Sequence, residues 1–266
     1  MLIDAHAHLD HYDSGNERRA ALNEIDRERI LTIAVAMNPA SYDATKRLAR
    51  GYKTIVPCFG IHPWEAPKHS RHLDSLLPQI AETPLIGEIG LDKKFVKDID
   101  LYPAQRRVFD FFLAAAKQHN KIVNIHSSGA EADVLAALES HGIERAIVHW
   151  YNGPMDVFEK LVARGCYFTF GVELKSSPAI QMLARACPQE RLLTETDNPG
   201  GAKWLFGQPG QPRIIGSVVA SLAEVRGTSP AEMVEIVRQN FLRLISGPTG
   251  DDAGLATVRD VLNPPA

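Results

Sequence analysis

The chain alternates short apolar runs with longer segments that have helical spacing. Apolar residues recur at helical intervals in segments such as Ala104–Gln118 and Glu131–Ser140. The short runs are rich in residues that favour strands: Leu2–His8, Ile30–Met37, Lys53–Ile61, Leu85–Leu91, Ile122–His126, Arg145–His149, Cys166–Val172 and Leu192–Asp197. Strands that alternate with helices form βαβ units and a parallel sheet. Eight such runs in 266 residues predict an α/β fold, a (β/α)8 TIM barrel rather than an open doubly wound sheet.

The rest of the chain extends this barrel and shows no sign of a second domain. Gly200–Pro212 is dense in Gly, Gln and Pro, which predicts a loop after the eighth strand. Ile214–Arg226 and Pro230–Ile245 have helical spacing, and a proline at the first turn marks the start of the second. We expect one domain over residues 1–246. The tail, 247–266, has the Pro, Gly and Asp content of a partly disordered segment.

Charge and cysteine usage exclude several classes of protein. A net charge of −3 argues against holding nucleic acid mainly through a basic surface, but not against gripping phosphates locally. No apolar run approaches the roughly 18 residues of a membrane span, and polar residues interrupt the N-terminal run, which argues against a signal peptide. The cysteines Cys58, Cys166 and Cys187 form no C-x-x-C pair. We therefore expect buried, reduced thiols in a cytoplasmic protein without a membrane partner.

Residue types that bind metals fall at the ends of five predicted strands. The six residues are His6, His8, Glu88, His126, His149 and Asp197. His6 and His8 are two positions apart, so both side chains can point into the barrel mouth. Each residue alone could be a satisfied core residue. Because barrel active sites assemble at the carboxyl ends of strands, the set together predicts one metal-binding pocket.

The chemistry of this set favours two divalent cations. Imidazole and carboxylate ligands suit Zn²⁺ or Mn²⁺, whereas an all-oxygen Mg²⁺ site would not need four histidines. Six ligands are too many for one tetrahedral ion, and Glu88 is the natural bridge between two. Such a pair suits in-line displacement at phosphorus by an activated water. We read the remaining histidines outside strand ends as solvated surface residues: His11, His69, His72, His119 and His141.

Four motifs resemble the TatD family of metal-dependent deoxyribonucleases. They are Leu2–Asp10 (LIDAHAHLD), Gly60–Pro63 (GIHP), Ile86–Asp92 (IGEIGLD) and Glu195–Pro199 (ETDNP). The segment Val237–Leu244 also resembles the closing helix of that family. The resemblance covers about residues 1–246. It implies a (β/α)8 barrel of the metal-dependent hydrolase type with two divalent cations, Zn, Mn or Mg.

The resemblance also implies a role for each site residue. His6, His8 and Asp197 would hold the first metal, His126 and His149 the second, and Glu88 both. Asp197 would also accept a proton from the attacking water, which makes Asp197 and Glu88 the expected catalytic residues. In the same way, Glu195 would orient a metal ligand. His62 would contact a substrate phosphate.

The sequence departs from the family pattern where substrate would bind. The arginine that the family often carries two residues after the fifth-strand histidine is Ser128 here. Trp150 and Tyr151 follow the sixth-strand histidine, and they either stack on a base or pack in the wall. The loop after the eighth strand lacks the usual basic stretch. Positive charge for binding substrate would instead come from three lysines, which could equally be solvated surface residues: Lys93, Lys94 and Lys203.

We therefore expect a metal-dependent phosphodiesterase acting on DNA, an exonuclease on single-stranded ends that uses a metal-activated water. The alternative is a binuclear-metal barrel hydrolase of amides, lactones or small phosphoesters. Many of those bridge their metals with a modified lysine on the fourth strand, and Glu88 stands there in this chain. A third interpretation is a barrel without catalysis, used as a scaffold. The oligomeric state stays open.

Overall fold

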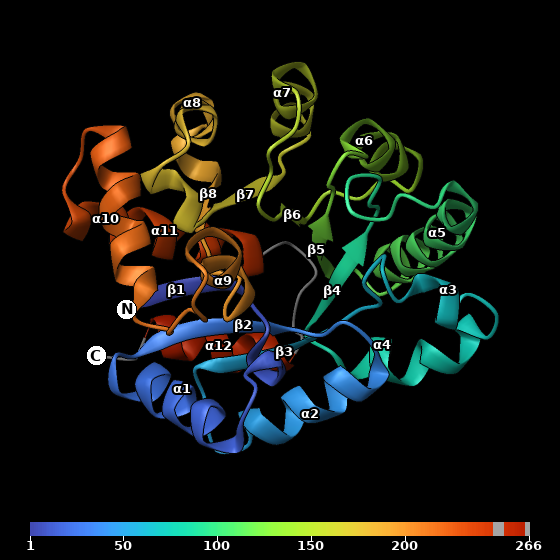
Figure 1. The fold of residues 1–266 in the computed structure, drawn as a ribbon, viewed down its shortest axis with the longest axis horizontal. Helices are drawn as coiled ribbons and strands as arrows, with labels where there is room; N and C mark the ends of the chain where they lie inside the picture. The colour runs from blue at the N-terminus through green and yellow to red at the C-terminus, as the bar shows by residue number, and fades with distance from the viewer. Residues whose placement is uncertain (247–252, 264–266) are drawn as a thin grey trace.

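The structure is a computed structural model that describes residues 1–246 and 253–263. Eight parallel strands lie side by side in chain order, and they confirm the predicted fold (Figure 1). Their bounds are β1 (Leu2–Ala7), β2 (Ile30–Val35), β3 (Ile55–Phe59), β4 (Leu85–Gly90), β5 (Ile122–His126), β6 (Ala146–Val148), β7 (Tyr167–Phe170) and β8 (Leu192–Thr194). The strands curve into a nearly closed barrel, with helices on its outside.

Contacts between β8 and β1 complete the ring. The Thr194 hydroxyl donates to the Ile3 carbonyl at 2.6 Å. Beyond the end of β8, the Asp197 N–H donates to the His6 carbonyl at 3.0 Å. The ring is therefore joined at the level of the residues predicted to bind metal.

The outer layer consists of helices whose starts are visible in the sequence. Ser14 and Glu17 form a reciprocal capping box at the first helix, and Asn38 and Ser229 each accept a backbone N–H at the start of theirs. The helices are α1 (Gly15–Arg27), α2 (Pro39–Ala49), α3 (Ala66–His69), α4 (Leu77–Glu82), α5 (Tyr102–Gln118), α6 (Glu131–Ser140), α7 (Met155–Ala163), α8 (Pro178–Ala186), α10 (Ile214–Arg226) and α11 (Pro230–Ile245). Short 3-10 turns complete the connections: η1 (Leu9–His11), η2 (Leu73–Leu76), η3 (Ile99–Leu101), η4 (Val172–Lys175) and η5 (Gln189–Arg191).

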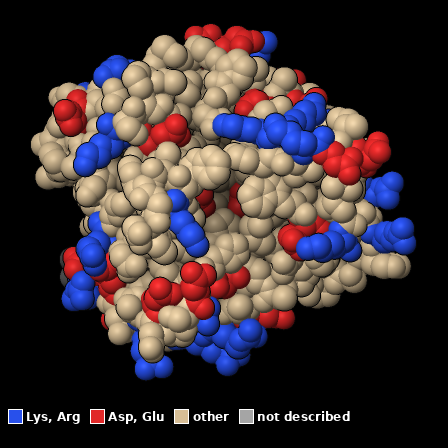
Figure 2. Space-filling view, in the orientation of Figure 1, with Lys and Arg blue, Asp and Glu red and all other residues tan. Residues whose placement is uncertain are grey.

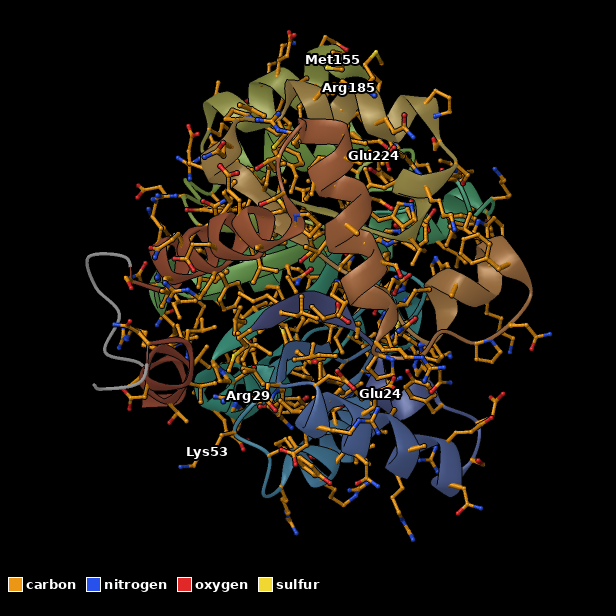
Figure 3. All side chains as sticks on the ribbon, turned by 90° about the vertical axis from the view of Figure 1, so that its left-hand side faces the viewer. Glu24, Arg29, Lys53, Met155, Arg185 and Glu224 are labelled. Atoms are coloured by element: carbon orange, nitrogen blue, oxygen red, sulfur yellow. The ribbon has the colours of Figure 1, made fainter. Side chains whose placement is uncertain are left out.

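The core occupies the barrel interior and the space between barrel and helices. Every residue of β2, β4 and β5 is buried, as expected for parallel strands that are covered on both faces. Polar contacts join the outer layer at its edges. Glu24 of α1, labelled in Figure 3, accepts from the backbone N–H and the guanidinium of Arg213, which immediately precedes α10, at 3.0 and 2.7 Å.

The loop predicted over Gly200–Pro212 is wrong in its first half. Residues Gly200–Phe206 form α9, which lies over the barrel opening in Figure 1 and projects from the same end in Figure 3. The two glycines at its start favoured a loop in the prediction, because glycine disfavours helical backbone. Gly207 ends α9 with a φ of +77°, a conformation that glycine adopts without strain.

A further helix lies within the predicted tail. Residues Ala253–Leu262 form α12, and its Leu255, Val258 and Leu262 side chains are buried. α12 contacts α11. Residues 247–252 and 264–266 lie outside the described residues, so the expectation of partial disorder in them stays a prediction, as does the domain boundary at 246.

Two further observations bear on the sequence predictions about cysteines and membrane spans. Cys58, Cys166 and Cys187 are all buried and unpaired, as predicted. Among the helices that the structure describes, none combines the length and apolar character needed to cross a membrane.

The closing helix α11 depends on one buried amide, which provides a test of the fold. The Asn240 amide donates to the carbonyls of Gln189 and Leu192, at 2.6 and 2.9 Å, and so ties α11 to the start of β8. Because Asn240→Ala would remove both of these hydrogen bonds, it should lower the free energy of unfolding by about 1–3 kcal/mol. Denaturant unfolding measures this. The exposed neighbour Gln239→Ala is the control, and equal stability of the two variants would contradict the assignment.

Candidate metal centre

The carboxyl ends of the strands surround a cavity of about 360 Å³. Figure 2 looks onto this end, and acidic atoms are visible inside a hollow near the centre of the face. Of the residues predicted for the site, those that line the cavity are His8, His62, Glu88, His126, His149, Trp150 and Asp197. His6 is fully buried beside them.

Glu88 stands at the centre of this group, and its two oxygens face different histidines. Oε2 lies 3.4 Å from His6 Nε2 and 3.2 Å from His8 Nε2. Oε1 lies 3.0 Å from His126 Nδ1 and 2.8 Å from His149 Nε2. His62 Nε2 also lies 3.4 Å from Oε1. A carboxylate with different histidines on each oxygen has the arrangement expected of a bridging ligand.

Asp197 adds a second carboxylate on the side of the first histidine pair. Its Oδ1 lies 3.8 Å from His6 Nε2 and 3.5 Å from His8 Nε2. Its side chain is 22% exposed, against 2% for that of Glu88, and it lines the cavity. The backbone φ of Asp197 is +49°, which is uncommon for a residue other than glycine. Backbone strain of this kind concentrates at functional sites.

Burial and charge compete at the centre. Burial by itself disfavours the ionised form of Glu88. The surrounding histidines outweigh it and hold the pKa of Glu88 well below its ordinary value. Burial raises the pKa of Asp197, although His8 and His6 act in the opposite direction. For His149, burial disfavours the charged ring, but Glu88 and Glu195 raise its pKa well above the usual range. The carboxylates thus attract positive charge into the buried space between them.

An outer set of polar groups fixes the rings. Asn124 Oδ1 lies 2.9 Å from His6 Nδ1, and its amide donates to the Ala5 carbonyl at 2.9 Å. The amide orientation makes Oδ1 the acceptor, so the hydrogen sits on His6 Nδ1 and the lone pair of Nε2 faces Glu88. Glu195 Oε2 lies 3.4 Å from His149 Nδ1, the position expected of a carboxylate that orients a ligand.

The sequence analysis did not identify Asn124 and Asp92 as residues that orient the histidines, although their positions in the sequence pointed to the site. Asp92 Oδ2 lies 3.0 Å from His126 Nε2 and directs the Nδ1 of that ring toward Glu88. Asp92 belongs to the same motif as Glu88, Ile86–Asp92. Asn124 precedes His126 by two positions on β5, so both side chains share one face of the strand.

Asp4, on β1 two positions before His6, supports the segment that follows β8. Its carboxylate accepts from the Thr196 backbone at 2.9 Å and from the Thr196 hydroxyl at 2.6 Å. Burial raises the pKa of Asp4 to about 7, against the lowering effect of the Thr196 hydrogen bonds. It therefore positions the segment that carries Asp197.

The residues present fit divalent cations. Within the described residues, His6 Nε2 and Glu88 Oε2 are buried atoms without a hydrogen-bond partner, and they face each other. Buried polar atoms are normally paired, so such atoms indicate a missing partner. His6, His8 and Glu88 place ligand atoms close enough to share one ion, and so do Glu88, His126 and His62.

His62 is distinguished from the other histidines by its hydrogen bond. Its Nδ1 accepts the Trp64 backbone N–H at 3.2 Å, so in the neutral ring the hydrogen sits on Nε2. That Nε2 lies 3.4 Å from Glu88 Oε1 and borders the cavity. Burial lowers the pKa of His62 to about 4, against the charge of Glu88, so the ring is neutral near pH 7. It offers a donor, as a phosphate contact requires.

The structure does not bring all the predicted substrate contacts to the cavity. Tyr151 is buried against Phe158 and Phe168. Lys93 is paired with Asp133 outside the cavity lining.

Other predicted contacts do reach the cavity or its surroundings. Trp150 lines the cavity, and its indole N–H donates to Glu173 at 2.6 Å. Lys94 lines it as well, whereas the Lys203 ammonium lies 4.0 Å from Asp13.

One histidine that we read as a surface residue also belongs to this region. His11 lines the cavity and stacks on His8, with ring centroids 4.8 Å apart and planes 9° from parallel. The short 3-10 turn η1 returns it to the mouth directly after β1. Its side chain is 42% exposed, so it is both solvated and part of the cavity wall.

Comparison with known proteins identifies relatives over nearly the whole chain. A model of the family described as TatD related DNase matches residues 3–246. The human protein named deoxyribonuclease TATDN3 is 28% identical, over 91% of this chain and 94% of its own. The Bacillus subtilis protein named uncharacterized metal-dependent hydrolase YabD is also 28% identical, over 92% of this chain and 98% of its own. The crystal structure of the Escherichia coli TatD homologue YjjV superposes with a TM-score of 0.83, at 26% identity, over 93% of this chain and 98% of its own.

The hydrogen bond from Asn124 to His6 supplies a test of the centre. Asn124→Ala frees the His6 ring to rotate and to change tautomer, so it should weaken divalent metal binding about 10- to 100-fold. Titration of the metal-free protein with Zn²⁺ or Mn²⁺ in a calorimeter measures this. Asn152→Ala changes an exposed asparagine of the same cavity and should leave the affinity unchanged. Unaltered affinity in Asn124→Ala, with the fold intact, would show that His6 does not bind a cation.

Proposed function

Because the chain belongs to the family of TatD-related DNases and is a metal-dependent hydrolase of the nuclease type, we propose that it hydrolyses phosphodiester bonds at the ends of single-stranded DNA. The observation that carries the proposal is Glu88, a buried carboxylate with at least two histidines facing each oxygen. Because each oxygen of Glu88 faces its own histidines, the arrangement suits two cations, which would stabilise the attacking and leaving oxygens of an in-line displacement.

Two sets of residues would hold the cations. His6, His8 and Asp197 would bind the first, and His126 and His149 the second. Glu88 would bind both. The imidazole-rich composition favours Zn²⁺ or Mn²⁺, and Mg²⁺ remains to be tested beside them. When bound, the cations would lower the pKa of a water molecule and neutralise charge that develops on the phosphate.

The chain's own groups would handle the proton and the phosphate. Of the two carboxylates of the centre, Asp197 is the more exposed to the cavity, which would place it to accept a proton from the attacking water. His62 offers its Nε2 hydrogen to a phosphate oxygen. Glu195 would keep the His149 ring in place from the far side. These roles divide proton transfer, phosphate contact and ligand orientation among three residues.

A strand end fits this site better than a wrapped duplex. Duplex binding by a groove relies on many phosphate contacts from Lys and Arg. The chain has a net charge of −3, and Lys94 is the lysine or arginine among the described residues that line the cavity. A cavity of about 360 Å³ is within the size range of small-ligand sites. We propose that the DNA is single-stranded and that its terminal nucleotide enters the cavity.

The alternative substrates are amides, lactones and small phosphoesters. They share the requirement for a polarised water, so the same metal centre could act on them. Glu88, rather than a lysine, at the end of β4 favours the phosphodiester. We also propose a cytoplasmic location, which the three buried, unpaired cysteines support.

Loss of the proposed proton acceptor should abolish most of the activity. Asp197→Asn keeps the shape of the side chain but cannot take the proton, so kcat should fall about 10²- to 10⁴-fold. The assay follows nucleotide release from end-labelled single-stranded DNA, duplex DNA and RNA with Mg²⁺, Mn²⁺ or Zn²⁺.

Two variants make this assay decisive. Asp13→Asn changes an exposed aspartate and should retain wild-type rates. Glu88→Ala should be inactive, which excludes a contaminating nuclease. Release of no nucleotide by the wild-type protein with any cation would refute the proposal, and turnover of a lactone or cyclic amide instead would establish the alternative.

A further inference from the structure

All three tryptophans of the chain line the cavity. Trp64 follows β3, Trp150 follows β6 and Trp204 lies on α9. Phe95, which follows β4, joins them. Trp64, Phe95 and Trp204 remain 48%, 43% and 71% exposed. Large aromatic rings are usually buried because their apolar surface is costly to hydrate, so exposed rings gathered at one cavity indicate a ligand that covers them.

Three of these rings form a continuous row across the rim, which we call the aromatic row: Trp64, Phe95 and Trp204. Trp64 and Phe95 have centroids 6.0 Å apart with planes at 69°. Phe95 and Trp204 are 5.7 Å apart with planes at 90°. Edge-to-face contacts of this kind use the edge of one ring and the face of another. They leave ring faces available to a flat molecule, which a stack of parallel rings would cover.

The aromatic row is attached to the metal centre. The Trp64 ring lies 4.8 Å from the His62 ring, which in turn lies 4.8 Å from the His126 ring. The Trp64 indole N–H donates to Asp92 Oδ2 at 2.7 Å, the same oxygen that lies 3.0 Å from His126 Nε2. One carboxylate therefore positions both a ligand of the centre and the first ring of the row.

Charge beside the row identifies the kind of ligand. The Lys94 ammonium lies 5.5 Å from the Phe95 ring centroid and borders the same cavity. His62 adds a hydrogen-bond donor on the side of the metal centre. Exposed ring faces beside two groups that suit phosphate match a molecule with both a planar ring and phosphates. An apolar ester or a sugar phosphate would use only one of these features.

We propose that the aromatic row stacks the nucleobase of the terminal nucleotide and thereby makes a base-bearing DNA end the preferred substrate. This inference rests on the proposed function and adds the group that the site recognises. Stacking on aromatic rings tolerates every base, because each base has a flat face. The row would therefore select for the presence of a base and not for its identity. Trp204, the most exposed ring, is the specificity-determining residue that the proposal names.

Binding without turnover gives the first test. Calorimetry with deoxyadenosine monophosphate and with deoxyribose 5-phosphate, each with Mn²⁺ present, measures the contribution of the base. The wild-type protein should bind the nucleotide about 5- to 150-fold more tightly than the sugar phosphate. Trp204→Ala should lose most of this preference, and Trp204→Phe should keep much of it. Phe206→Ala removes an exposed ring of α9 outside the cavity lining and should change nothing.

Kinetics on strand ends gives the second test. Single-stranded DNA that ends in an ordinary nucleotide is compared with the same strand ending in an abasic one. Trp204→Ala should raise KM for the ordinary end with little change in kcat, and it should leave both parameters unchanged for the abasic end. Because Trp204 is exposed, the variant should keep the wild-type melting temperature.

The two tests separate this inference from the proposed function. Equal affinity for nucleotide and sugar phosphate, or equal effects of Trp204→Ala and Phe206→Ala, would overturn the base-stacking role even if DNA is hydrolysed. Selective binding of the nucleotide without any hydrolysis would support the aromatic row and contradict the nuclease assignment. An equal rise in KM for ordinary and abasic ends would also overturn the role of the row.

Discussion

The structure depends on the burial of one carboxylate at the mouth of the barrel. Glu88 is 1% exposed, and a buried charge is costly unless other groups compensate it. Its compensation comes from the histidines around it, which belong to β1, to β5 and to the segments after β1, β3 and β6. A barrel can supply such an arrangement, because the carboxyl ends of its strands all surround one opening.

The groups around the centre hold it in one geometry. Asn124 fixes the His6 ring, Asp92 the His126 ring and Glu195 the His149 ring. Asp4 holds the segment after β8 through Thr196, so that Asp197 reaches the cavity. These contacts set the direction in which the lone pair of each histidine nitrogen points. That direction matters because a metal ion binds its ligands in a defined coordination geometry. The centre is therefore rigid where cations would bind and open on the side of the cavity.

The fold and the convergence of the inner side chains on one cavity could be predicted from sequence, and the contacts around them could not. The eight strands follow from apolar runs, and His6, Glu88 and Asp197 follow from their places at strand ends. The side-chain contacts beyond them depend on three-dimensional packing that no local pattern records. Lys93 and Lys94 are adjacent in sequence, yet one pairs with Asp133 and the other borders the cavity.

Loops and surface rings were the hardest to predict. The glycines at the start of α9 are typical of a loop, whereas in the structure they belong to a helix that brings Trp204 against Phe95. The three rings of the aromatic row come from parts of the chain far apart in sequence. None belongs to a repeating sequence pattern that would identify it as part of a binding surface. Their common position appears only once the barrel brings the loops after β3, β4 and β8 to one rim.

Anomalous diffraction from crystals grown with Zn²⁺ or Mn²⁺, recorded at the absorption edge of the metal, tests the central claim most directly. The account predicts two peaks beside Glu88, one next to His6, His8 and Asp197 and the other next to His126 and His149. Absence of any peak at the barrel mouth under saturating metal, or peaks confined to sites elsewhere on the protein, would contradict it.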